Sequence, residues 1–85
     1  MINYKEAGYR IQTQRKILGL TQEVVSEKIG ITPSFFSQIE SGTRKAGIKT
    51  FVSISKILGI SLDYIFDAGL SEQELDRIET LVQSL

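Results

Sequence analysis

The chain has 85 residues, enough for one small hydrophobic core, and its ten basic side chains balance ten acidic ones. It contains neither cysteine nor histidine, which excludes disulfides, thiolate metal sites and the usual general base. No apolar run reaches the roughly 18 residues of a membrane span, and the opening "MINYKEAGYR" lacks the apolar core of a signal peptide. We therefore expect a cytoplasmic protein without membrane contact, metal or cofactor, and no small-molecule ligand is evident.

The charges are divided along the chain. Residues 1–60 carry nine Lys and Arg against four Glu, whereas residues 61–85 carry one Arg against six Asp and Glu. A basic body with an acidic end indicates a polyanion as a partner of the body. Ordinary solvated surface is the alternative interpretation of the same pattern.

Glycines divide the first half of the sequence into three predicted helices. In the first, Tyr4, Ala7, Ile11 and Leu18 fall on one face of the helix. The predicted N-terminal caps are Asn3 with Glu6, Thr21, and Thr32 followed by Pro33, and the predicted stops are Gly19, Gly30 and Gly42.

The second half continues the helical pattern without a strand signal. A largely buried fourth helix ends at Gly59, Ser61 caps the short helix "LDYIFD", and Ser71 with Glu74 opens a last amphipathic helix. The sequence thus predicts an all-α fold of five compact helices with an additional C-terminal helix. The segment "DAGLS", residues 67–71, suggests a boundary between a body, residues 1–68, and an appendage, residues 69–85.

The second and third predicted helices are joined by only Gly30, Ile31 and Thr32. A three-residue turn containing glycine is typical of a helix-turn-helix, whose second helix can enter the DNA major groove. Many helical hairpins share such a turn, so this signal is weak alone.

The third helix carries an unusual polar face. Its members fall within an arc of roughly 140° and are mostly small, which permits close approach to a groove about 12 Å wide. Gln can bond adenine N6 and N7, and Ser can bond several bases. A solvent-exposed face is the alternative, although such a face ordinarily carries Lys and Glu, and no charge precedes Glu40. The face consists of Pro33, Ser34, Ser37, Gln38 and Ser41.

Residues 8–66 resemble the phage repressor and Cro-like helix-turn-helix family, also called the xenobiotic-response-element family. The resemblance rests on "GLTQ", "IGIT", "SQIESG" and "LGISLDYIF" in this order and spacing. It implies a lambda-repressor-like five-helix fold that binds double-stranded DNA, usually as a two-fold homodimer. It assigns a phosphate contact to Gln22, contacts with bases and neighbouring phosphates to Thr32, Ser34, Ser37 and Gln38, backbone contacts to Thr43, Arg44 and Lys45, and an ion pair to Arg15 and Glu40.

The sequence departs from the family pattern at three positions. Pro33 and Phe35 stand where polar residues are common, and Gly47 stands where a Ser or Asp cap would suit the fourth helix. Phe35 could contact a thymine methyl, fold against the core or meet another protein. Since no basic residue lies on the base-facing side, we expect recognition to favour A·T-containing positions.

The last helix has an apolar seam. In a monomer it would pack on the body, and in a homodimer it would form the contact between subunits, which would hold the acidic end away from DNA. The seam comprises Leu75, Ile78, Leu81, Val82 and Leu85.

Two functions fit these features. The first is a transcriptional regulator, most simply a repressor on a palindromic operator. The second is a protein-interaction module, such as an antirepressor or an antitoxin, with weak DNA binding. An enzyme is not expected, because the carboxylates and hydroxyls show no nucleophile-and-base arrangement.

Overall fold

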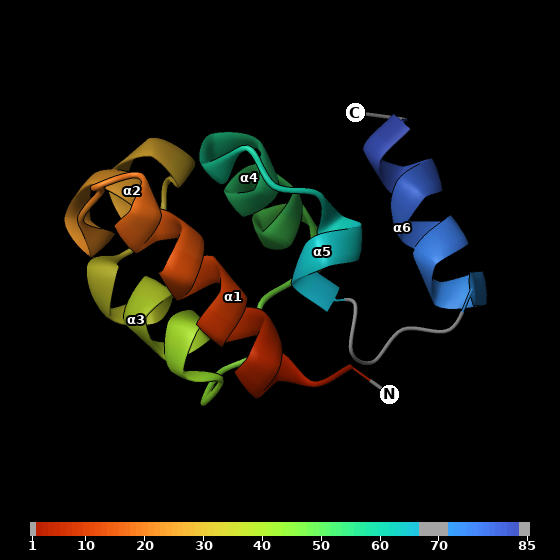
Figure 1. Ribbon diagram of the computed structural model, residues 1–85, viewed down its shortest axis with the longest axis horizontal. Coiled ribbons are helices and arrows are strands. Elements are labelled where there is room, and N and C mark those ends of the chain that lie inside the picture. The colour runs from red at the N-terminus through yellow and green to blue at the C-terminus, as the bar shows by residue number, and fades with distance from the viewer. Residues whose placement is uncertain (1, 67–71, 84–85) are drawn as a thin grey trace.

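A computed structural model describes residues 2–66 and 72–83, which form six α-helices and no strand (Figure 1). The all-α prediction is therefore confirmed for this part of the chain. The helices are α1 Tyr4–Ile17, α2 Gln22–Ile29, α3 Pro33–Ser41, α4 Ile48–Leu58, α5 Leu62–Phe66 and α6 Glu72–Gln83. None of these helices is long and apolar enough to cross a membrane.

The predicted caps set the helix starts. Asn3, Thr21, Thr32 and Ser61 each accept a hydrogen bond from the backbone N–H three residues later, at 3.0–3.1 Å. These side chains satisfy amides that lack a partner in the first turn. Gly47 begins α4 without a side-chain cap, as expected, and the predicted Ser71 cap lies outside the described residues.

The core forms where α1, α3, α4 and α5 meet. Its fully buried members include Ala7 and Ile11 from α1, Phe36 from α3 and Ile54 from α4. The edge-to-face pair Phe51 and Phe66, with ring centroids 4.8 Å apart, joins α4 to α5.

Leu18, which helical periodicity groups with Ala7 and Ile11, has a side chain that is 46% exposed. Leu18 is the C-cap that directly follows the end of α1 at Ile17, one turn beyond the last buried residue of that helix. The last inward-facing position of α1 belongs to Arg15, which is buried.

Helix α6 lies beside α4 and α5, at the opposite end of the molecule from α2 and α3 (Figure 1). Ile78 is buried in the core cluster of this single chain, and Val82 packs against that cluster. These two seam residues pack on the body of their own chain, and the role of the seam in a homodimer stays a prediction. The side chains of Leu75 and Leu85 lie outside the described residues.

Candidate nucleic-acid interface

The α2–α3 connection has a fixed shape. Gly30 ends α2 with φ 78°, a left-handed conformation that favours glycine, and its N–H bonds Ser26 and Glu27 carbonyls. The next N–H, of Ile31, bonds the Ser26 carbonyl at 3.0 Å. Thr32 then caps α3 directly, so each of the three turn residues has a fixed backbone conformation or hydrogen bond.

Helix α3 divides sharply between a polar and a buried side. Phe36, Ile39 and Glu40 are buried, whereas Ser34 and Ser37 are exposed and Gln38 is half-buried. Within the described residues, the side chains of these last three make no hydrogen bond. Their donors and acceptors are therefore available to a ligand, and small side chains leave the helix axis close to it.

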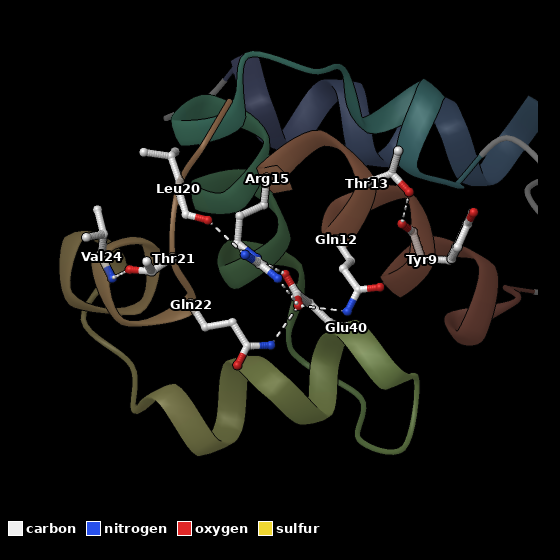
Figure 2. Close-up of polar contacts among 9 residues, drawn as sticks. All are labelled: Tyr9, Gln12, Thr13, Arg15, Leu20, Thr21, Gln22, Val24 and Glu40. Atoms are coloured by element: carbon white, nitrogen blue, oxygen red, sulfur yellow. Dashed lines mark hydrogen bonds and ion pairs between the residues drawn. The ribbon is translucent and has the colours of Figure 1, made fainter. Parts of the chain in front are cut away.

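The buried side of α3 is anchored through the Glu40 carboxylate (Figure 2). Arg15 Nε donates to Glu40 Oε2 at 2.6 Å, and Arg15 Nη2 donates to Oε1 at 3.1 Å. Arg15 Nη1 also donates to the Leu20 carbonyl at 2.8 Å. The hydrogen bond with Glu40 raises the pKa of Arg15, although burial opposes it, so the guanidinium stays charged throughout the neutral range.

Two glutamines complete the set of donors to Glu40. Gln22 Nε2 lies 2.8 Å from Glu40 Oε1, and Gln12 Nε2 approaches the same oxygen at 3.5 Å. One carboxylate thereby ties α3 to α1 and α2, as Figure 2 shows. Sequence reasoning missed Gln12, although its place one turn before Arg15 on α1 puts both on one helix face.

The side chain of Gln22 already has a partner inside the protein, so a phosphate would not be its only contact. One amide hydrogen is taken by Glu40, which leaves one donor for a phosphate. The backbone N–H groups of Gln22 and Glu23, in the first turn of α2, have no partner within the helix. The start of α2 can thus offer three N–H donors and a positive dipole end to an anion.

The loop after α3 folds back onto the Gln38 carbonyl. That oxygen accepts from the N–H groups of Thr43 at 3.1 Å and Arg44 at 3.3 Å. The hydroxyls of Ser41 and Thr43 lie 2.8 Å apart. The backbone of Arg44 is therefore held next to the end of α3.

Both loop cations rest on aromatic rings. The Arg44 guanidinium carbon lies 4.9 Å from the Phe35 ring centroid, and Lys45 Nζ lies 5.4 Å from that of Tyr4. Phe35 is half-buried and packs against the core. Of the three roles considered for Phe35, this placement matches packing against the core, and contact with a thymine methyl or with another protein stays a prediction.

Together these elements define a helix-turn-helix domain: a short fixed turn, an exposed polar helix and adjacent cations. The chain belongs to this family, since the model of a helix-turn-helix domain matches residues 8–70. It is 39% identical over 59 residues to the uncharacterized HTH-type transcriptional regulator YqaE of Bacillus subtilis (strain 168), covering 69% of this chain and 51% of that protein. This is a class of DNA-binding transcriptional regulators and not a class of enzymes.

Solved structures share the fold. The restriction-modification controller protein C.AhdI from Aeromonas hydrophila matches with a TM-score of 0.70 at 24% identity, covering 74% of this chain and 96% of that one. A chain of the SinR protein/SinI protein complex matches with a TM-score of 0.66 at 25% identity, covering 91% and 79%. The chain spans about half the length of the first curated relatives it matches.

Proposed function

We propose that this chain represses transcription by binding a palindromic operator as a homodimer, with α3 in the major groove. The observation that carries the proposal is the division of α3. The exposed Ser34 and Ser37 and the half-buried Gln38 have side chains free to bond, while the buried Glu40 fixes the helix from behind. A rigid helix with unbonded polar groups loses little conformational entropy on binding.

Base reading falls to Gln38 and the serines. Gln38 is long enough for a bidentate bond to adenine, and Ser34 and Ser37 can bond several bases. Thr32 already uses its hydroxyl oxygen as an acceptor for the Phe35 N–H, so its hydroxyl hydrogen is left for a neighbouring phosphate. The absence of Lys and Arg from this face favours A·T-containing positions.

Backbone contacts fall to the start of α2 and to the loop after α3. Gln22 would place its remaining amide hydrogen on one phosphate, and Thr43, Arg44 and Lys45 would hold another segment of the backbone. Phe35 acts here as a platform that limits the motion of Arg44, and because Phe35 belongs to α3 itself, its ring would also meet a thymine methyl in the groove.

For the homodimer, α6 remains the proposed contact element. Two-fold pairing would set two recognition helices about 34 Å apart, one turn of duplex. Because Ile78 and Val82 pack on their own body, the contact would use the remaining seam positions and the surface that α6 builds with α5. Such pairing also places the acidic end away from the DNA.

The test is a selection of binding sites from random duplex DNA with the purified chain. A palindrome with half-sites about 10 base pairs apart is expected. The variant Gln38→Ala should relax the preference at one base position and lower affinity there by about tenfold, whereas Lys56→Ala, at an exposed position on α4, should leave the pool unchanged.

The protein-interaction alternative predicts a different salt response. A protein that neutralises phosphates loses affinity steeply as salt rises. If no sequence is enriched even at low salt, the repressor proposal fails and the chain acts through protein contacts.

A further inference from the structure

An apolar pocket of about 320 Å³ lies where the start of α1, the start of α4 and α6 meet. Three aromatic rings, those of Tyr4, Phe51 and Phe66, form part of its wall. The start of α4 and the inner face of α6 add Ile48 and Ile78. The volume is at the lower end of the range of about 300–1,000 Å³ found for small-molecule sites.

Among the residues whose side chains the structure describes, Arg77 is the single charged one that lines this pocket. It is exposed, and no carboxylate in the described part of the chain lies within ion-pair distance of it. A second cation, Lys45, lies against the ring of Tyr4, one of the pocket walls. The pocket therefore combines an apolar interior with positive charge at its edge, and a planar guanidinium suits a carboxylate through two parallel hydrogen bonds.

We propose that this pocket binds a small amphipathic carboxylate, with its apolar chain or ring among Tyr4, Phe51 and Phe66 and its carboxylate on Arg77. Charge complementarity selects an anion over a neutral or cationic compound. Size selects a small molecule, since a pocket of this volume offers far less surface than the roughly 800 Å² per partner of a stable protein interface.

The position of the pocket connects it to the loop after α3. Ala46 and Ile48 line the pocket, and Lys45 immediately precedes them. Tyr4 contacts both the pocket and the Lys45 ammonium. A bound carboxylate would thus contact the residues that place Lys45, so ligand and DNA would alter each other's affinity by the same factor. This coupling rests on the proposed function, whereas the ligand site does not.

The experiment titrates the full ¹⁵N-labelled chain with decanoate and, separately, with decylamine, which has the same chain length and the opposite charge. Saturable amide shifts are expected at Tyr4, Ile48 and Ile78 with decanoate, and at least about tenfold weaker binding with decylamine.

Three variants locate the site. Arg77→Gln should weaken decanoate binding about tenfold, and the matched control Lys56→Gln, a cation on α4 outside this pocket, should leave it unchanged. Ala46→Leu should fill the pocket and abolish binding. Because Arg77 is exposed, its variant folds whether or not Ala46→Leu does.

The site proposal is overturned by absence of saturable shifts, by equal binding of decylamine, or by equal effects of Arg77→Gln and Lys56→Gln. A pocket occupied by a second copy also overturns it, and would appear as self-association that Ala46→Leu abolishes. Duplex affinity measured with and without decanoate then tests the coupling. Decanoate binding without any change in DNA affinity overturns the coupling alone, while a decanoate-binding chain that binds no DNA overturns the proposed function.

Discussion

The two ends of this molecule are held by different forces. Behind α3, a buried carboxylate receives donors from α1 and α2, and the helices approach closely enough that a Cβ at Gly8 would overlap the carbonyl oxygens of Ile39 and Glu40. At the other end, α6 and the start of α4 meet across an apolar pocket, and α4 begins without a side-chain cap. The end that carries the polar face is fixed in position, whereas the end that carries the pocket has room for a ligand.

The largest expected effect comes from removing the anchor of α3. Glu40→Ala leaves the buried guanidinium of Arg15 without its anion, so the free energy of unfolding should fall by about 3–5 kcal/mol. Urea denaturation followed by circular dichroism measures this. Glu27→Ala, at an exposed position on α2, is the control and should change stability little. A loss below about 1 kcal/mol for Glu40→Ala would contradict the assigned role of the network.

The close approach of α1 and α3 gives the second prediction. Gly8→Ala improves helix propensity, which alone would stabilise α1 by about 1 kcal/mol. The overlap of the new methyl with the Ile39 and Glu40 carbonyls should reverse the sign and cost about 1–3 kcal/mol net. The shift in urea midpoint checks the sign, and a stabilised variant would show that the two helices separate without penalty.

The third prediction concerns DNA binding by the loop after α3, which lies between the two ends of the molecule. Arg44→Gln should weaken binding to every duplex about equally and reduce the slope of log affinity against log salt by about 1. Phe35→Ala, which removes the ring beneath Arg44, should weaken binding up to about fivefold while keeping the slope. Lys56→Gln is the charge-matched control. Equal slopes for Arg44→Gln and Lys56→Gln would remove Arg44 from the interface.

The smallest effect is expected at the start of α4. Gly47 has φ −69° and ψ 161°, which any residue adopts, and a Cβ there meets nothing within 4 Å. Gly47→Ser adds the missing cap and restricts the unfolded chain, so stability should rise by about 0.5 kcal/mol. The melting temperature measures it, with Gly8→Ala as the opposite case. A destabilised Gly47→Ser variant would contradict the assignment of Gly47 as an N-cap position where a capping side chain fits.

Local signals in the sequence determined the helices. Asn3, Thr21, Thr32 and Ser61 cap helices as predicted, because a capping side chain bonds an amide only three residues away and needs no tertiary contact. The polar face of α3 was equally readable, since helical periodicity alone groups Ser34, Ser37 and Gln38. The resemblance to the Cro-like family paired Arg15 with Glu40 across 25 residues, which periodicity cannot do.

Tertiary structure decided the rest. Only packing shows that Gln22 and Gln12 converge on Glu40, that Arg44 rests on Phe35 and that Ile78 joins the core of its own chain. Each of these contacts joins different helices or loops, and their geometry depends on how closely the helices approach one another. The exposure of Leu18 and the pocket beside α6 likewise depend on how the helices pack. The sequence by itself determined where helices begin and which faces they offer, while the distances between those faces fixed what each side chain is free to bind.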